Sequence, residues 1–368
     1  MDRSLGRARD GLVLGVVLAL TTFAWPAAAA PRSCRGHTAT IVGSPNSDRL
    51  RGTPGRDVIV ALGGNDEIHA GGGGDIVCGG RGNDLVFGGA GRDRLYGGSG
   101  KDSLLGHTGR DRLFGESGDD TLVGWLNSDR LAGGAGTDGA HFGTFGITQS
   151  RRIVADLAKG TARGEGKDVL VGIENLTTNQ FECGCAGVTF LGDDGPNVLR
   201  DFGSNYATDI FKGRGGDDML VANTGPDRLY GQAGDDRMII GLHNDDETDG
   251  EDEFRGGRGT DTADYSDPYM PPGAVTVDLA AETATGPQIE TDLLAGIENV
   301  IGTPGDDVLS GDAGPNRLRG GEGADELSGN GGDDHLNGGA GENTNNGGDG
   351  TDECINPDSS AGAVDCET

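Results

Sequence analysis

An aspartate recurs at every ninth position between Gly43 and His141. Each one stands at position six of the unit G-G-x-G-x-D-x-U-x, where U is a bulky apolar residue, as in GGRGNDLVF at 79–87. The series consists of Asp48, Asp57, Asp66, Asp75, Asp84, Asp93, Asp102, Asp111, Asp120, Asp129 and Asp138. A tight turn alone accepts Asp, Asn or Gly. An unbroken series of Asp therefore indicates a requirement for negative charge.

The spacing of these carboxylates predicts cation binding. If two units form one coil, Asp side chains eighteen residues apart stack on one edge at a strand spacing of about 4.8 Å. At an effective dielectric constant near 20, two such charges repel by roughly 3–4 kcal/mol. A hard divalent cation between the turns reverses the sign of this energy, and carboxylate and carbonyl oxygens are the ligands that calcium prefers.

The rest of each unit supplies the elements that hold the carboxylates in place. The glycines allow positive φ and close backbone packing, so the first six residues can turn tightly. The last three residues, x-U-x, suit a very short strand with U pointing inward. The U residues are Leu50, Ile59, Ile68, Val77, Val86, Leu95, Leu104, Leu113, Leu122, Leu131 and Ala140. A fixed repeat of this kind predicts a solenoid with a thin apolar core.

These phased units resemble the RTX (hemolysin-type) calcium-binding nonapeptide repeat. The resemblance implies an all-β fold, the parallel β-roll, in which each ion sits between the turns of units n and n+2. Eleven turns then allow about nine ions in this stretch. The alternative is that the Gly-Asp turns only initiate strands, without metal. The expected calcium ligands are Asp57, Asp66, Asp75, Asp84, Asp93, Asp102, Asp111, Asp120, Asp129, Asp138, Asp218, Asp227, Asp236, Asp261, Asp307, Asp325 and Asp334.

The repeat divides the chain into three blocks. Block 1 spans 43–141, the irregular block 2 spans 192–264, and block 3 spans 302–355. Block 3 weakens toward its end, since Asn316 and Asn343 replace Asp and Asn345 takes a core position. Within block 2, the acidic insertion 244–253 is expected to be a solvated loop. We expect a cap strand over the open end of the roll within 30–42, at Thr38–Val42, and a tail at 356–368.

Two connectors, 142–191 and 265–301, interrupt the period. They contain two related copies, IVADLAKGTARGEGKDVLVGIENL and VTVDLAAETATGPQIETDLLAGIENV, so the chain is a duplicated module. We expect these connectors to be longer β coils that continue the roll. A small separate ligand-binding insert is the alternative.

The N-terminal residues 1–29 are typical of a signal peptide. Arg3, Arg7 and Arg9 precede an apolar stretch at 11–25 and a run of small residues that ends at Ala30, and we expect cleavage after Ala29. An uncleaved membrane anchor is the alternative; after cleavage no membrane span is expected. Secretion suits the six cysteines. The expected bridges are Cys34–Cys78 and Cys354–Cys366, and Cys183 and Cys185 could pair locally or between molecules.

Composition restricts the function. The net charge of −31 argues against nucleic acid and anionic membranes as partners and favours cations. High charge with low hydrophobicity predicts disorder until calcium binds. Short motifs of hydrolases and nucleotide-binding enzymes are absent, so we expect no enzymatic activity.

The expected function is therefore that of a secreted calcium-binding β-roll protein with a structural or adhesive role at the cell envelope or matrix. Cell-surface or matrix glycans are candidate partners. The alternative is a calcium-dependent polysaccharide lyase or epimerase, which would need a basic, aromatic-lined groove.

Overall fold

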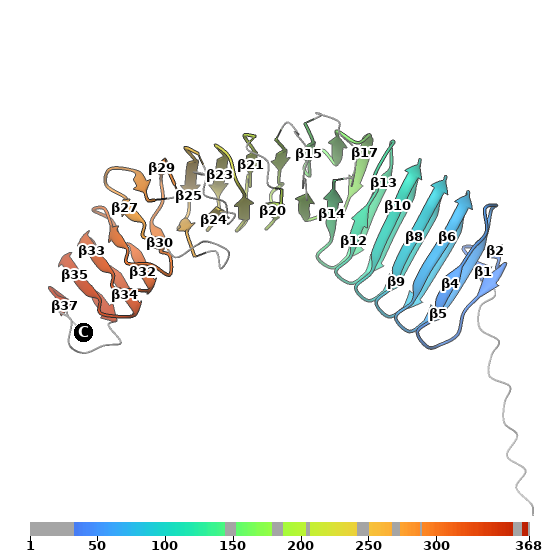
Figure 1. The fold of residues 1–368 in the computed structure, drawn as a ribbon, viewed down its shortest axis with the longest axis horizontal. Helices are drawn as coiled ribbons and strands as arrows, with labels where there is room; N and C mark the ends of the chain where they lie inside the picture. Colours follow the sequence, from blue (N-terminus) through green and yellow to red (C-terminus); the bar gives the residue numbers. More distant parts are fainter. Residues whose placement is uncertain are drawn as a thin grey trace, which may run out of the picture.

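The computed structural model describes residues 33–143, 152–178, 187–203, 207–240, 250–266, 273–287, 289–355 and 363–366. Throughout these ranges every regular element is a β-strand, and most neighbouring strands run parallel. The strands wind into an elongated, arched solenoid (Figure 1). The predicted all-β class and the parallel β-roll are thus confirmed.

In the described ranges, one face of the solenoid is a sheet of fifteen strands, here named sheet I. Within each block its strands pair in register eighteen residues apart, as Leu104 does with Val86 and Leu122. The strands are β4 (Arg49–Arg51), β6 (Glu67–Gly73), β8 (Leu85–Gly91), β10 (Ser103–Gly109), β12 (Thr121–Val123), β14 (Gly139–Phe142), β18 (Asn175–Thr178), β20 (Val198–Asp201), β22 (Met219–Ala222), β24 (Arg237–Ile240), β26 (Thr262–Asp264), β30 (Asn299–Ile301), β32 (Arg317–Glu322), β34 (His335–Ala340) and β36 (Glu353–Ile355).

The opposite face, sheet II, is built from the alternate units. Many of its strands are longer than the predicted x-U-x, because the backbone stays extended through the first residues of the next unit, as in β9. The strands are β3 (Ile41–Val42), β5 (Val58–Gly63), β7 (Ile76–Arg81), β9 (Arg94–Ser99), β11 (Arg112–Ser117), β13 (Arg130–Ala135), β19 (Thr189–Leu191), β21 (Ile210–Lys212), β23 (Arg228–Ala233), β25 (Glu253–Arg258), β31 (Val308–Ser310), β33 (Glu326–Gly331), β35 (Thr344–Asp349) and β37 (Ala363–Val364).

The core is one thin layer of inward side chains that lies between the two sheets. Position eight of the repeat supplies it, and Leu95, Leu104 and Leu113 are fully buried there. In and beside the first connector the core is bulkier, since Phe190 and Phe211 stack with their ring centroids 5.5 Å apart. Near the C-terminus Asn345 occupies a fully buried core position, as predicted.

Each connector folds as an antiparallel meander within sheet II, which agrees with the expectation of longer β coils. The first consists of β15 (Val154–Asp156), β16 (Thr161–Arg163) and β17 (Lys167–Val171), and the second of β27 (Thr276–Asp278), β28 (Thr283–Thr285) and β29 (Thr291–Ala295). In the first copy β17 pairs with β13 and β15 pairs with β19, so three strands lie between β13 and β19. In the second copy β29 pairs with β25 and β27 with β31.

The meanders account for the arch. Across the first connector, sheet I needs only β18 between β14 and β20, whereas sheet II holds three strands. Two extra strands widen sheet II locally by about 10 Å. The roll must therefore bend at each connector. Figure 1 shows the direction of the solenoid changing near β15–β17 and near β27–β29.

The N-terminal segment differs from the single cap strand predicted for Thr38–Val42. It forms a hairpin of β1 (Ser33–Cys34) and β2 (His37–Thr38), followed by β3, which pairs with β5. Cys34 packs with Val58, Val60 and Ile76. These apolar side chains point away from the main core, so the hairpin covers a patch of sheet II that would otherwise face water.

Both predicted disulfides are present, Cys34–Cys78 and Cys354–Cys366. Cys183 and Cys185 lie outside the described residues, as do the predicted signal peptide 1–29 and most of the predicted tail. None of the elements in the described ranges is a helix long and apolar enough to cross a membrane.

Candidate calcium sites

Carboxylates preceding the strands of sheet I stack in a column that we name column I. The backbone N–H of each Asp donates to Oδ1 of the Asp eighteen residues later, as from Asp84 to Asp102 at 2.8 Å. Similar bonds link the turns from Asp48 to Asp138. The predicted stacking of Asp side chains on one edge is therefore observed.

A second column, column II, precedes the strands of sheet II. In block 1 it runs from Asp57 to Asp129 through the same N–H to Oδ1 bonds of 2.7–2.9 Å. Asp218, Asp236, Asp261 and Asp334 belong to column I, and Asp227, Asp307 and Asp325 to column II. Every ligand predicted from the sequence thus lies in one of the two columns.

The second oxygen of most of these carboxylates lacks a protein donor. It is buried and accepts no hydrogen bond in Asp66, Asp75, Asp84, Asp93, Asp102, Asp111, Asp120, Asp129, Asp138, Asp218, Asp236, Asp261, Asp325 and Asp334. Leaving a buried charged oxygen unsatisfied costs several kcal/mol at the order-of-magnitude level. A row of such oxygens fits bound cations.

The glycine at position one leaves space beside this oxygen. A Cβ placed on Gly88 would lie 2.9 Å from Oδ2 of Asp93 and 3.0 Å from the carbonyl oxygen of Gly106. One turn further, a Cβ on Gly106 would lie 2.8 Å from Oδ2 of Asp111 and 3.1 Å from a carbonyl oxygen. Carboxylate and carbonyl oxygens therefore converge where a side chain is missing, which is the donor set of a calcium site.

Burial strongly disfavours the ionised carboxylates when no cation is present. It raises the pKa of Asp84 to about 7, and the nearby Asp102 and Asp66 add to the effect. The pKa of Asp129 rises to about 8, mainly through burial and further through Asp168. Because the charged form is needed for binding a cation, protons and cations compete for these columns.

Two predicted ligands differ from the others. Oδ2 of Asp57 accepts hydrogen bonds from the backbone N–H and the hydroxyl of Thr53. At Asp307 the N–H of Thr303 donates to Oδ2 and its hydroxyl to Oδ1. Although burial opposes ionisation of Asp57, hydrogen bonds from Thr53 and Thr40 outweigh it and lower the pKa of Asp57. In the second unit of block 1 and the first unit of block 3 the protein itself satisfies the carboxylate.

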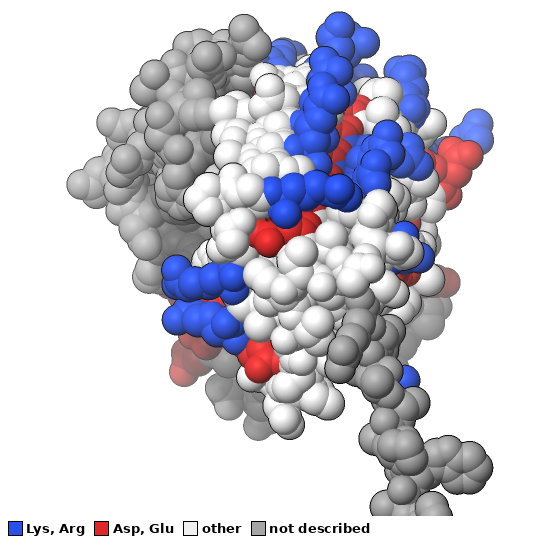
Figure 2. All heavy atoms as spheres, turned by 90° about the vertical axis from the view of Figure 1, so that its right-hand side faces the viewer, with Lys and Arg blue, Asp and Glu red and all other residues white. Residues whose placement is uncertain are grey.

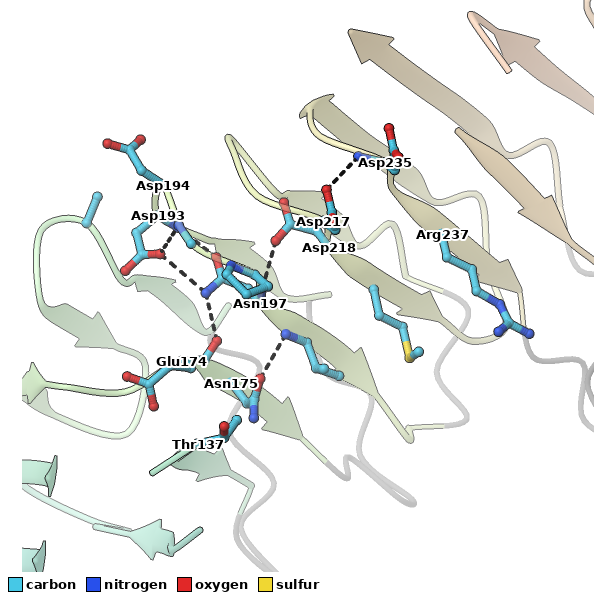
Figure 3. A pocket seen from close by; sticks show the side chains of 15 residues that line it. Thr137, Glu174, Asn175, Asp193, Asp194, Asn197, Asp217, Asp218, Asp235 and Arg237 are labelled. Atoms are coloured by element: carbon cyan, nitrogen blue, oxygen red, sulfur yellow. Dashed lines mark hydrogen bonds between the residues drawn. The ribbon is translucent and has the colours of Figure 1, made fainter. Parts of the chain in front are cut away.

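Column I continues through the first connector by means of residues that the repeat pattern does not contain. The N–H of Asp138 donates to Oε2 of Glu174 at 2.7 Å, and the side chain of Asn197 donates to the carbonyl oxygen of Glu174 at 2.9 Å. The N–H of Asn197 then donates to Asp218 at 2.8 Å. Figure 3 shows the part of this path from Glu174 through Asn197 to Asp218, beside a cavity of about 880 Å³ that these three residues help to line.

The second connector repeats this arrangement. The N–H of Asp261 donates to Glu298 at 2.8 Å, the side chain of Asn316 donates to the carbonyl oxygen of Glu298, and the N–H of Asn316 donates to Asp334. The Glu of each Gly-Ile-Glu-Asn element thus takes the place of the repeat Asp. The repetition of this element is visible in the sequence, but the nonapeptide pattern does not predict that its Glu joins the column.

Column II is interrupted where column I is continuous. Its first segment ends at Asp168, which accepts from Asp129; the second runs from Asp209 to Asp292 and the third from Asp307 to Asn343. Asp168, Asp209 and Asp292 are buried column members that the repeat pattern did not predict.

The expectation that 244–253 is a solvated loop is wrong at its C-terminal end. Asp252 is buried and accepts from the N–H of Asp227, and Glu253 begins β25. Asp227 and Asp252 are 25 residues apart in the sequence, whereas column partners in regular turns are 18 residues apart. Seven extra residues thus interrupt the nonapeptide repeat, and Asp252 then continues column II.

Within the described ranges, no three or more carboxylate, imidazole or thiol groups gather at one point. The acidic side chains meet instead in succession along the columns. Because calcium takes six to eight oxygen ligands, backbone carbonyl oxygens of the turns must complete the shell of an ion held there.

Comparison with known families agrees with this geometry. The family described as RTX calcium-binding nonapeptide repeat (4 copies) matches residues 42–77, 79–104, 105–140, 212–246, 294–327, 301–336, 311–344 and 319–354. These segments cover more than half of the chain, so the protein belongs to the RTX calcium-binding repeat family. It is a calcium-binding β-roll protein. Among curated proteins, none matches the chain.

Proposed function

We propose that this protein is secreted and folds outside the cell when calcium binds between its turns. The observation that carries the proposal is the row of buried Oδ2 atoms without a hydrogen-bond donor. Repulsion of roughly 3–4 kcal/mol between successive carboxylates, repeated along two columns, exceeds the usual stability of a domain, about 5–15 kcal/mol. Calcium binding and folding are therefore one process.

The proposed ligands are the predicted column residues together with Asp168, Glu174, Asp209, Asp252, Asp292 and Glu298. Asp57 and Asp307 contribute less, since Thr53 and Thr303 already satisfy their carboxylates. The two disulfides support secretion, because such bridges persist in oxidising compartments.

The role that we propose is structural or adhesive, without catalysis. Buried acidic side chains that serve as column members are unsuited to proton transfer while they hold a cation. A polysaccharide lyase or epimerase would need an additional acid or base at a binding groove. Recognition of a surface glycan is compatible with a structural role.

Far-UV circular dichroism of the chain from residue 30 tests the central proposal. With a chelator we expect a largely disordered spectrum, and with millimolar calcium a strand-rich one. Magnesium is the control, because it prefers a small octahedral shell with retained waters and should order the chain poorly. Strand content that stays the same after chelation would contradict calcium-coupled folding.

A further inference from the structure

Five exposed arginines flank column II between residues 92 and 130. They form two rows on either side of the buried carboxylates, at positions five and seven of the alternate units that build sheet II. The residues are Arg92, Arg94, Arg110, Arg112 and Arg130. Together with Asp93, Asp111, Asp129 and Ser128 they line a groove of about 390 Å³. Figure 2 faces the N-terminal end of the roll and shows Lys and Arg side chains gathered in the upper right of the view, with Asp and Glu side chains between them.

The rows place like charges directly beside one another. Arg112 on β11 is the register partner of Arg94 on β9 and of Arg130 on β13. Among the described residues, no carboxylate forms a salt bridge with any of the five guanidinium groups. Like charges directly opposite each other in a sheet are destabilising. Departures from favourable pairing of this kind are typical of binding surfaces.

The arginines are not needed to neutralise the negative charge of the buried carboxylates. Column I in block 1 stacks its Asp side chains with the same hydrogen bonds. There, the units at 79–87 and 97–105 carry Asn83 and Lys101 at position five and Leu85 and Ser103 at position seven. Stacked carboxylates therefore do not require flanking arginines. The groove on column II has a separate role.

We propose that this groove binds a linear acidic polysaccharide with one anionic group per sugar residue. Arginine pairs bidentately with carboxylate or sulfate groups. Successive arginines in a row stand one strand spacing apart, about 4.8 Å, which is close to the length of one sugar residue in an extended chain. A cation held by Asp93 and Asp111 adds positive charge to the floor of the same groove.

The lining of the groove favours a polysaccharide over a nucleic acid. Single-stranded nucleic acids are held by basic grooves that also offer aromatic side chains for base stacking. The residues that line this groove include no aromatic side chain. Long-range repulsion from the net charge of −31 is screened beyond about 8 Å at physiological ionic strength, so the local arginines determine binding.

The proposal rests on the proposed function, because the two rows exist only in the folded roll. The test measures binding of an oligogalacturonate too short to form a gel, by titration calorimetry in millimolar calcium. The variant is Arg110→Gln with Arg112→Gln. Its matched control is Arg317→Gln with Arg319→Gln, which removes two exposed arginines from β32 in block 3. Circular dichroism checks that each variant is folded.

We expect the wild type and the control to bind alike, and the groove variant to bind at least about tenfold more weakly. Folding with calcium but no binding of the oligogalacturonate would overturn the groove while leaving the proposed function intact. Equal weakening by both variants would also overturn it, as would tighter binding of single-stranded DNA through the same arginines. If strand content does not depend on calcium, the proposed function is wrong. The calorimetric titration of the two variants then still decides whether the groove binds the oligogalacturonate.

Discussion

Columns I and II are built from the same unit but differ in continuity. Column I crosses both connectors, because Glu174 and Glu298 replace the repeat Asp and Asn197 and Asn316 join the next block. Column II stops at each connector, where the antiparallel meander occupies its sheet. A solenoid can therefore be interrupted on one face while the other face remains a continuous series of linked turns.

The largest effect that probes this comparison is the response of the calcium-free chain to acid. The pKa of Asp84 in column I and of Asp129 in column II is raised, to about 7 and about 8. A raised pKa in the folded state adds stability at low pH that is lost as the pH rises through that value. We expect chelated protein to gain strand content when the pH falls from about 8 to about 5.

Far-UV circular dichroism against pH, in chelator, measures this gain. Asp57 should contribute in the opposite direction, since its pKa is lowered and its stabilising effect is lost in acid. A chelated chain that stays disordered at every acidic pH would show that carboxylate charge is not what prevents folding.

A second prediction removes one interior carboxylate from each column. Asp93→Ala should lose affinity at the two spaces between turns that its carboxylate borders, and it leaves the buried N–H of Asp75 without an acceptor. We expect a loss of about 3 kcal/mol in folding free energy with calcium bound. Asp84→Ala is the matched change in column I and should behave alike, because both columns are continuous within block 1.

Calorimetric counting of ions in the two variants checks this equality. A clear difference between them would mean that the columns differ in more than their continuity. If a fragment covering 31–145 bound only one or two ions, the assignment of stacked sites would itself be wrong.

A third prediction tests the joint in column I. Glu174→Gln keeps the oxygen that accepts from Asp138 but removes the charge, and we expect it to cost about 1–2 kcal/mol. Because column I is continuous, amide protection should fall on both sides of the first connector. Asp168→Asn removes the equivalent charge where column II ends, so only block 1 should lose protection.

Hydrogen exchange resolved by peptide distinguishes the two variants. Glu298→Gln is the internal control, since it should reproduce the effect of Glu174→Gln one module later. If the Glu174 and Asp168 variants lowered amide protection over the same residues, the continuity of column I would not determine how far the effect extends.

The most local effect concerns the C-terminal end. The Cys354–Cys366 bridge closes a loop of 12 residues, for which the chain-entropy model gives roughly 3 kcal/mol. Block 3 needs this support because Asn345 is buried in its core with an unpaired Oδ1. Cys354→Ser should raise the calcium concentration that orders block 3 and leave block 1 nearly unchanged. Hydrogen exchange of both blocks at increasing calcium concentrations measures this effect. An equal loss of protection in the two blocks would show that the roll is one cooperative unit and would contradict the prediction.

Sequence periodicity predicted the features that depend on phase. The core residues such as Leu95, the stacked Asp side chains and the two disulfides follow from spacing of nine and from the positions of cysteines. Glu174 and Asp252 were missed for a physical reason, because each re-enters its column after an insertion that shifts the phase. Only the hydrogen bonds of the folded chain show where the period resumes.

Features that depend on contacts across the surface were also beyond the repeat. The hairpin β1–β2 lies over Val58, Val60 and Ile76, whose apolar character at outward positions was the available signal. The satisfied carboxylate of Asp57 depends on Thr53 at position two, where most units carry glycine or another residue without a hydroxyl.

The connectors also set the shape of the whole chain through parity. The chain enters the first meander from β14 and the second from β26, both in sheet I, with the eight strands from β19 to β26 alternating between the sheets in the interval. An even number returns the chain to the same face, so the two bends have the same sense. One nonapeptide more or fewer between the connectors would move the second meander to the opposite face and turn the arch into an S. Units added or lost in pairs would change its length and keep its curvature.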